Sequence, residues 1–402
     1  MSRLDAVIVS AVRSPIGRAY KGSLTGVRAD DLAAQIVGKA LARVPALDPT
    51  TLDDVVMGCA QPAGEQGYNL GRQVAMHLGL DMVPGTTVQR YCASSLQAIR
   101  MAFHAIRAGE GHAFVAAGAE VVSHYPAGKA DGMPGTRNPR WPERGSTLPP
   151  MPWRDPRETG ELPDVYIAMG ETAENVASLC GITRREQDEF AVRSQNNAEK
   201  AQADGFWDLD ITPVTLPDGT VLSRDDGPRP GVTLEKVAAL QPVFRPDGTV
   251  TAGNCCPLND GAAAVVVMSA ARARELGLTP LARIVATGVS ALSPEIMGLG
   301  PVEASRRALA HAGMSIGDVD LIEINEAFAA QVIPSVRQLG ADPERVNVHG
   351  GAIAVGHPFG MTGARIATTL LNGLVHRDAQ IGLETMCTAG GQGMAMIVER
   401  LS

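Results

Sequence analysis

The segment Thr51-Leu-Asp-Asp-Val-Val-Met-Gly-Cys59 has the same pattern as a second segment, Ser315-Ile-Gly-Asp-Val-Asp-Leu-Ile-Glu-Ile-Asn325. In each, a polar turn leads into a short apolar run that is rich in Val, Ile or Met. Each segment also follows an amphipathic helical pattern, from Asp30 to Arg43 and from Val302 to His311. Short apolar runs of this kind are typical of buried parallel strands. Both segments are therefore predicted to fold as helix, turn and central strand.

The similarity continues downstream of both segments. Cys92 lies 34 residues after Gly58, and His357 lies 32 residues after Asn325. Each of these reactive residues precedes another helical pattern, and each half then contains further apolar runs that read as strands. The helical patterns are Ser95 to Ile106 and Thr362 to Leu374, and the strands are Ala113 to Ala117, Ala262 to Met268, Ile381 to Cys387 and Met394 to Glu399. The shared order predicts a duplicated α/β unit.

The residues between the two halves have a different composition. Residues 121–248 are rich in Pro, Gly, Arg and Trp, with helical patterns at Glu171 to Leu179 and Arg184 to Ala203. A stretch this long is not expected to be a linker. We interpret it as an inserted loop domain that covers an active site or an oligomer interface. The predicted first half then consists of residues 1–120 and 249–275, and the second half of residues 276–402.

Composition and charge limit the classes of function. The chain has 402 residues, is 45% hydrophobic and carries a net charge of −8 at pH 7. A protein whose main task is to bind nucleic acid usually has a basic face, and none is evident. No run of about 18 apolar residues predicts a membrane span, and the N-terminal residues lack the apolar stretch of a signal peptide. We therefore expect a cytoplasmic protein without nucleic-acid partners.

The spacing of the cysteines predicts that their thiols are free. They form no CxxC pair and no spacing typical of a zinc site or a disulfide framework. This pattern favours a reducing compartment and predicts no bound metal. The six residues are Cys59, Cys92, Cys180, Cys255, Cys256 and Cys387.

Cys92 is the first candidate for chemistry, because it lies where a predicted strand meets a predicted helix. A helix N-terminus lowers the pKa of a thiol, and its free N–H groups can stabilise an oxyanion. Taken alone, a buried structural cysteine explains this pattern more often than a nucleophile does. His357 is the second candidate, in the glycine-rich stretch from His349 to Gly363. Histidine is the usual activator of a thiol near neutral pH, although a surface loop would also fit.

Two further motifs lie at predicted strand ends. Cys387 runs into the glycine-rich turn Thr388-Ala-Gly-Gly-Gln-Gly393, which would also suit a sharp turn before the last strand. Asn325 ends a buried strand, where ligands bind in α/β sheets, and it could equally cap a helix. His349 is another histidine candidate, but no pattern supports it.

Together these motifs resemble the four signature blocks of the thiolase family in order and spacing. The blocks are Cys92-Ala-Ser, Asn325-Glu-Ala-Phe, Gly356-His-Pro and Cys387-Thr-Ala-Gly-Gly-Gln-Gly. Two more stretches, Arg13-Ser-Pro-Ile-Gly and Thr251-Ala-Gly-Asn, are also similar to thiolase segments, so the resemblance covers essentially the whole chain. It implies a thiolase-like duplicated five-layered α-β-α-β-α fold with an inserted loop domain.

The resemblance also implies a reaction and roles for the residues. Thiolases cleave 3-ketoacyl-CoA with free CoA, or run the reverse condensation. Cys92 would take up the acyl group, and His357 would draw off its proton. Cys387 would be the acid/base for the acetyl-CoA carbon. Asn325 would hold a water at one oxyanion site, and the backbone N–H groups of Cys92 and Ala389 would form the other.

The family further suggests contacts with the substrate. Arg229 matches an arginine at the adenine end of CoA, while Ala252 and Cys256 lie in a block that contacts pantetheine. Met169 would line the acyl channel. CoA would act as a substrate, with no bound cofactor. We also expect a homodimer or homotetramer, with a hydratase/dehydrogenase as a possible further partner.

Departures from the family pattern bear on substrate preference. Cys256 stands where serine is usual, Gln89 where Asn is common, and Ser95 where Gly is common. Short-chain biosynthetic members tend to carry a histidine at the position of Ala168, so we expect acyl chains longer than acetoacetyl, as in β-oxidation.

Three alternatives stay open. A biosynthetic acetoacetyl-CoA thiolase would share every motif. A β-ketoacyl synthase would pair its cysteine with two histidines, which Cys387 argues against. A non-catalytic thiolase-like subunit should have lost a catalytic residue, and this chain keeps all four.

Overall fold

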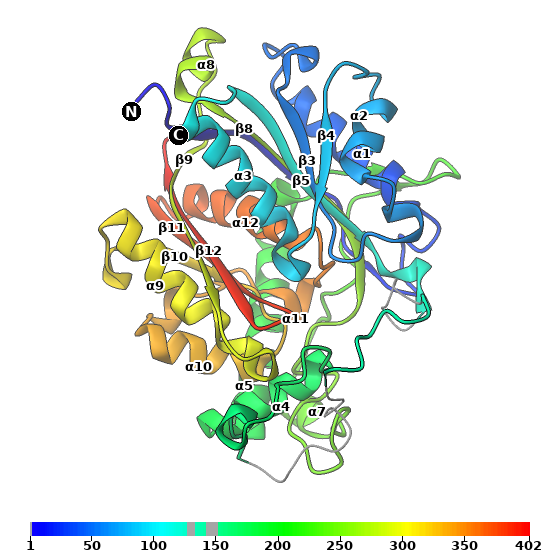
Figure 1. Ribbon diagram of the computed structural model, residues 1–402, viewed down its shortest axis with the longest axis vertical. Coiled ribbons are helices and arrows are strands. Elements are labelled where there is room, and N and C mark those ends of the chain that lie inside the picture. Colours follow the sequence, from blue (N-terminus) through cyan, green and yellow to red (C-terminus); the bar gives the residue numbers. More distant parts are fainter. Residues whose placement is uncertain (1, 127–132, 142–151) are drawn as a thin grey trace.

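The computed structural model describes residues 2–126, 133–141 and 152–402 (Figure 1). Ten of its strands form one mixed sheet in the order β10-β11-β12-β9-β1-β8-β5-β3-β4, with β2 (Gly17–Arg18) beside β8. The first half supplies β1 (Ala6–Arg13), β3 (Asp54–Gly58), β4 (Gly85–Val88), β5 (Ala113–Val121) and β8 (Asn259–Ser269). The second half supplies β9 (Ala282–Ala291), β10 (Leu321–Ile324), β11 (Ile381–Thr388) and β12 (Gln392–Arg400).

The two halves repeat one strand order. In the first half, β1, β8 and β5 pair antiparallel, and β5, β3 and β4 pair parallel. In the second half, β9, β12 and β11 pair antiparallel, and β11 pairs parallel with β10. A parallel bridge between Ile322 and Val346 takes the place of β4. The halves join where β1 meets β9 over two residue pairs, Val7 with Arg283 and Ile8 with Ala282. The predicted duplication is confirmed.

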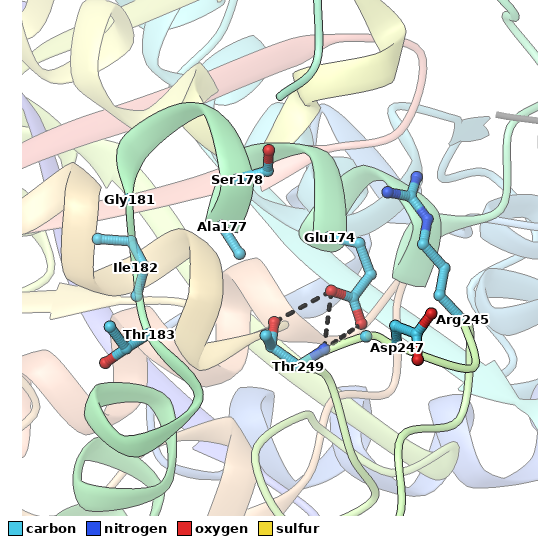
Figure 2. Close-up of a pocket in the computed structure, with 10 residues that line it drawn as sticks. Glu174, Ala177, Ser178, Gly181, Ile182, Thr183, Arg245, Asp247 and Thr249 are labelled. Atoms are coloured by element: carbon cyan, nitrogen blue, oxygen red, sulfur yellow. Dashed lines mark hydrogen bonds between the residues drawn. The ribbon is translucent and has the colours of Figure 1, made fainter. Parts of the chain in front are cut away.

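The described part of the insert contains helices and two very short strands. The elements are α4 (Met169–Cys180), α5 (Arg184–Ala203), α6 (Phe206–Asp210), β6 (Val214–Thr215), β7 (Val221–Leu222) and α7 (Leu234–Ala238). Both predicted helical patterns are therefore helices, although residues 127–132 and 142–151 of the insert lie outside the described residues. The carboxylate of Glu174 accepts hydrogen bonds from the backbone and side chain of Thr249 (Figure 2). This contact fastens α4 to the chain that returns to β8.

Helices cover both faces of the sheet and lie between its halves. Helices α3 (Ser94–Ala108) and α12 (Thr362–His376) lie in the middle, against strands of both halves (Figure 1). On the outer face of the first half lie α1 (Ala29–Ala42) and α2 (Leu70–His77), and on that of the second lie α9 (Gly300–Ala312) and α10 (Ala329–Leu339). Two short helices complete the fold, α8 (Ala270–Glu275) and α11 (Ala352–Val355). Counted across the molecule, these elements form the five layers of a thiolase-like fold.

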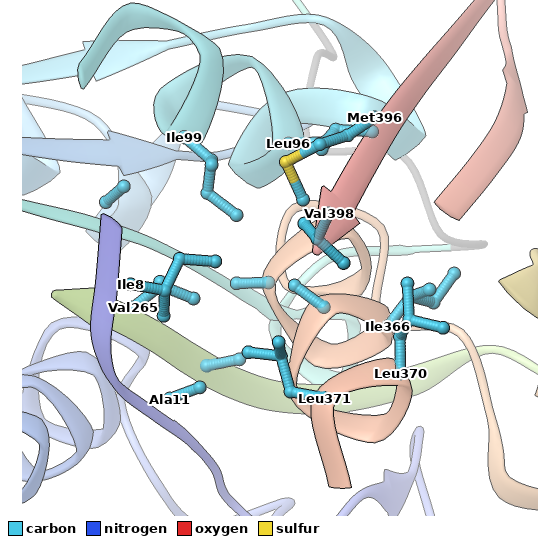
Figure 3. Packing of buried hydrophobic residues seen from close by; sticks show 14 of the residues in the cluster. Ile8, Ala11, Leu96, Ile99, Val265, Ile366, Leu370, Leu371, Met396 and Val398 are labelled. Atoms are coloured by element: carbon cyan, nitrogen blue, oxygen red, sulfur yellow. The ribbon is translucent and has the colours of Figure 1, made fainter. Parts of the chain in front are cut away.

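The central core lies where the two halves meet (Figure 3). Leu96 of α3 and Leu370 of α12 pack there with Ile8 of β1 and Met396 of β12. Each large aliphatic side chain buried in this way contributes roughly 1.5–3 kcal/mol. Because both faces of the sheet are covered, every residue of β5 and β8 is buried. This explains why these strands have no polar alternation in sequence.

Two glycines allow the start of α3 to approach its neighbours closely. A Cβ atom on Gly58 would lie 2.3 Å from the backbone N of Ser95, and one on Gly363 would lie 2.3 Å from that of Leu96. Any other residue would push α3 away from β3 or from α12. The two glycines thus determine how deeply Cys92, which lies just before α3, is buried.

In the part of the chain that the structure describes, no helix is long and apolar enough to cross a membrane.

Candidate active site

Cys92, His357, Cys387 and Asn325 all lie near strand ends and are buried, Cys92 with 8% of its surface exposed and the others with at most 1%. Asn325 directly follows β10, and Cys387 is next to last in β11. Cys92 follows β4 by a few residues, and His357 lies in the loop between α11 and α12. The sites of parallel α/β sheets are built at this end of the strands.

A sharp backbone turn presents Cys92. Tyr91 has a φ of +43°, in the left-handed region that a large side chain rarely adopts, at a cost of about 1 kcal/mol. The hydroxyl of Ser94 accepts a hydrogen bond from the backbone N of Arg90 at 2.9 Å and donates one to the carbonyl of Tyr91 at 2.6 Å. These bonds hold the strained turn in place before α3 begins.

The pKa of the Cys92 thiol differs from the sequence-based expectation. Burial raises this pKa to about 12, although hydrogen bonds from the backbone of Ala389 and of Cys92 itself act to lower it. The expectation of a lowered pKa is therefore wrong for the resting protein, because desolvation outweighs the N–H groups. The same hydrogen bonds show that Ala389, from the far end of the chain, reaches Cys92.

His357 is held as a neutral base. Its Nδ1 lies 2.7 Å from the hydroxyl of Thr362, which donates its own proton to the carbonyl of Pro358 at 2.7 Å. Nδ1 must then carry the ring proton. The amide Nδ2 of Asn325 donates to Nε2 at 3.3 Å, so Nε2 presents a lone pair. Burial lowers the pKa of His357 to about 3, and the charge of Arg365 acts in the same direction.

The first half of the chain anchors the loop that carries His357. The backbone N of His357 donates to Asn259 at 2.9 Å, and that of Gly360 donates to the carboxylate of Glu120 at 2.8 Å. The hydroxyl of Ser95 accepts from the backbone N of Ala364 at 2.9 Å. The histidine and Cys92 come from different halves, so these bonds set their relative position.

An apolar cluster surrounds Cys387. Its thiol packs with Phe328 and Met297, and Met169 and Cys256 lie against the same group. Burial raises the pKa of Cys387, and the nearby Cys92 raises it further. Cys387 is therefore protonated at rest and can donate a proton to a carbanion beside it.

Two of the candidate CoA contacts share a cavity of about 270 Å³. Arg229 and Ala252 both line it, together with Arg18 and Lys236. Its described lining contains no acidic residue, so the cavity suits an anionic group. Cys256 and Met169 do not line this cavity and lie in the cluster around Cys387 instead.

A second cavity, of about 320 Å³, lies between α4 and the Arg245 to Thr249 segment (Figure 2). It contains none of the four candidate residues. Glu174, which lines it, is already satisfied by Thr249 and Val250. We interpret this cavity as a by-product of the contact that fastens α4.

Some residues behave differently from what their sequence patterns suggested. His349 lies in the core, stacked on Phe206 with ring centres 3.7 Å apart. Thr362, which orients His357, was not predicted; its place five residues after the histidine is the only available signal.

Among the described residues, no group of three or more His, Cys, Asp or Glu side chains could hold a metal ion. All six cysteines are free.

Comparison with known families agrees with this geometry. Residues 6–271 match the family described as "Thiolase, N-terminal domain", and residues 278–400 match "Thiolase, C-terminal domain". The chain belongs to the thiolase family. The family and fold expected from the four sequence blocks are thereby confirmed, while the exact boundaries of the insert stay a prediction.

Several thiolases are similar to this one over their full length. It is 45% identical to the beta-ketoadipyl-CoA thiolase of Escherichia coli, covering 99% of this chain and 100% of that protein. It is 46% identical to an acetyl-CoA acetyltransferase of Cupriavidus necator, covering 98% and 99%. The crystal structure of the Bacillus anthracis acetyl-CoA acetyltransferase superposes on this thiolase with a TM-score of 0.87 at 41% identity, covering 99% of each chain.

Proposed function

We propose that this thiolase cleaves 3-ketoacyl-CoA with free CoA, giving acetyl-CoA and a shortened acyl-CoA, through an acyl group held on Cys92. One observation carries the proposal: the backbone N–H groups of Cys92 and Ala389, one from each half, both lie close enough to the Cys92 thiol to lower its pKa. Two such donors at one sulfur suit an oxyanion that forms beside it. Each can lower the barrier by about 3 kcal/mol.

The first step uses the neutral pair of Cys92 and His357. As the sulfur attacks the 3-keto carbon, its proton passes to Nε2 of His357, and the amide of Asn325, which donates to that nitrogen at rest, gives way to it. The carbon–carbon bond then breaks, and Cys387 protonates the carbon of the departing acetyl-CoA enolate. The covalent route splits one hard step into two.

The second step returns the enzyme to its starting state. The thiol of free CoA attacks the thioester on Cys92, giving up its proton to the thiolate of Cys387. The sulfur of Cys92 leaves and recovers a proton from His357. The shortened acyl-CoA then dissociates, acetyl-CoA having left before free CoA entered.

We assign Asn325 to an enolate site that includes Nε2 of His357. Its Nδ2 already donates to His357, while its Oδ1 is buried without a partner among the described residues. A buried carbonyl oxygen of this kind suits a water that completes the site.

The basic cavity at Arg229 and Ala252 is the proposed place for the CoA phosphates and adenine. Pro257 also lines it, and its neighbour Cys256 belongs to the cluster around Cys387, so the two regions adjoin along the chain. Pantetheine would run from one to the other. The proposal also includes a reducing compartment such as the cytoplasm, since Cys92 and Cys387 must stay free.

The apolar cluster supports a preference for apolar acyl chains longer than acetoacetyl. Phe244 meets Phe328 edge to face at 6.3 Å between ring centres, and Met169 lies in the same cluster as Phe328. Each methylene buried there contributes about 0.8 kcal/mol to binding. A terminal carboxylate, as in a ketoadipyl group, would lose its hydration against these side chains.

The test is kcat/KM for thiolysis across 3-ketoacyl-CoA esters from four carbons upward, with 3-oxoadipyl-CoA in parallel. We expect a medium-length apolar chain to react best. Acetoacetyl-CoA as the best substrate would favour the biosynthetic alternative, and 3-oxoadipyl-CoA as the best would overturn the apolar preference. Absence of CoA-dependent cleavage for every ester would refute the reaction itself and favour a non-catalytic subunit.

A further inference from the structure

The two N–H groups at Cys92 belong to different halves of the chain. Cys92 stands before α3 in the first half, and Ala389 stands in the turn between β11 and β12 in the second. No single element carries both groups. Their separation therefore depends on contacts that cross between the halves.

Two side-chain contacts tie the two segments together, and a third holds the turn at Ala389. The hydroxyl of Thr388 donates to the carbonyl of Arg90 at 2.6 Å. The guanidinium Nη1 of Arg90 donates to Oε1 of Gln392 at 2.7 Å. The amide Nε2 of Gln392 in turn donates to the carbonyl of Ala389 at 3.4 Å. Arg90 is itself anchored on α3, through a bond from its Nε to Gln97 at 3.0 Å.

We propose that Thr388 and Gln392 are positioning residues, which hold Ala389 against the turn at Cys92 and so set the spacing of the two oxyanion donors. The inference rests on the proposed function, because it takes Cys92 as the residue that carries the acyl group. Neither side chain touches the reacting atoms; each acts through the backbone it holds.

The local structure argues that these contacts serve the site more than the stability of the fold. The carbonyl of Arg90 also accepts a hydrogen bond from the backbone N of Ala93 at 3.0 Å, so it keeps a partner without Thr388. The pairing of β11 with β12 continues through backbone bonds along its whole length. Loss of the Thr388 hydroxyl would therefore leave the fold in place. It would free the turn to move relative to Cys92, whose neighbour Tyr91 is strained.

The charge state of Cys92 gives an independent readout of this spacing. Burial raises the pKa of its thiol, and the hydrogen bond from Ala389 acts to lower it. If Ala389 moves away, the thiolate loses one of its donors. Alkylation of Cys92 then requires a higher pH, whatever the stability of the fold.

The experiment compares Thr388→Val, which has nearly the same shape and no hydroxyl, with Thr388→Ser, which keeps the hydroxyl. For each we would measure kcat, KM for CoA and the pH dependence of Cys92 alkylation by iodoacetamide. In Thr388→Val we expect kcat to fall about tenfold or more with KM within about twofold, and the alkylation profile to move to higher pH. Thr388→Ser should retain most of the kcat and the wild-type profile.

Gln392→Leu provides a second variant. It should show the same fall in kcat with little change in KM, even if Thr388→Val does not fold. The inference alone is overturned if Cys92 is labelled first in the wild type but both variants keep its alkylation profile and kcat. It is also overturned if kcat falls only together with the melting temperature while the alkylation profile stays fixed. First labelling of another cysteine in the wild type would instead refute the proposed role of Cys92, and this inference with it.

Discussion

Cys92 lies close enough to Cys387 to raise the pKa of its thiol, yet the surroundings of the two cysteines differ. Cys92 has two backbone donors, whereas Cys387 is embedded among apolar side chains. We predict that Cys387→Ala still forms an acyl-enzyme from an acyl-CoA, because Cys92 and His357 are intact. Carbon–carbon cleavage should fall by about two orders of magnitude or more, the scale of a positioned proton donor.

Mass spectrometry of the acyl-enzyme and a thiolysis assay separate these two effects. Cys180→Ala is a suitable control for losing a thiol from the same apolar cluster, because Cys180 lies at the end of α4 and has no role in either half-reaction. Equal loss of both half-reactions in Cys387→Ala would contradict separate roles for the two cysteines.

Thr362 fixes the tautomer of His357 by accepting from Nδ1. We predict that Thr362→Val lowers kcat about tenfold, the effect of losing roughly one hydrogen bond on the base, with little change in KM. Thr362→Ser should retain most of the activity, since it keeps the hydroxyl. Steady-state kinetics on the pair would decide, and equal kcat values for Val and Ser would show that the hydroxyl is not needed.

The sequence alone predicted the four candidate residues of the site. Cys92, His357, Cys387 and Asn325 each stand in a motif with a recognisable neighbour. Thr362 stands in no such motif, because its role depends on which side chain the ring of His357 contacts in the folded structure. The pKa of Cys92 was also misjudged, since the helix N-terminus is visible in sequence while the depth of burial is not.

At the scale of elements, β10 and β11 place two buried carboxyl groups side by side. Glu323 and Glu384 are register partners in this parallel pair. Burial raises the pKa of Glu323 to about 8, although the charge of Arg365 opposes this. Burial also raises the pKa of Glu384. An unfolded chain would release the proton of Glu323 near its ordinary pKa of about 4.3.

Between these two pKa values the folded protein keeps a proton that the unfolded chain has lost. The stability contribution of Glu323 is thus present at low pH and is lost as the pH rises toward about 8. We predict that the melting temperature of Glu323→Gln, relative to wild type, rises by about 2 °C or more from pH 5 to pH 8. Glu303→Gln, on the exposed side of α9, is the control and should show no such trend. If the difference in melting temperature between Glu323→Gln and wild type stayed constant from pH 5 to pH 8, the retained proton on Glu323 would be contradicted.

Helices and strands were predicted correctly where the pattern depends only on residues close together in the sequence. The predicted helices at Asp30 to Arg43 and Arg184 to Ala203 match α1 and α5 within a residue at each end. By contrast, β9 was missed. Gly288 interrupts β9 because a Cβ atom there would lie 2.1 Å from the carbonyl of Ala304 on α9. Such contacts depend on segments that are distant along the chain.

At the scale of the whole molecule, the sheet ends at β4 with an edge that has no neighbour among the described strands. Large apolar side chains lie exposed on the segments flanking it, with Tyr68 93% exposed and Met82 89% exposed. An edge of this kind readily pairs with another chain. We predict that the protein is at least a dimer with two-fold symmetry.

Light scattering at micromolar concentration would test this. Tyr68→Glu should weaken the association, while Val375→Glu, at an exposed apolar position on α12, should not. A monomeric mass for the wild type would refute the prediction.

The place of β1 in the sheet has a consequence for how the chain is made. Its strand partners are β8 and β9, which begin at Asn259 and Ala282. On the ribosome, β1 must wait for some 250 further residues before either partner exists. At about 5–20 residues per second, that wait lasts roughly 10 to 50 seconds. For that time Ala6–Arg13 is an apolar segment without a partner, which is the kind of segment that a holding chaperone binds.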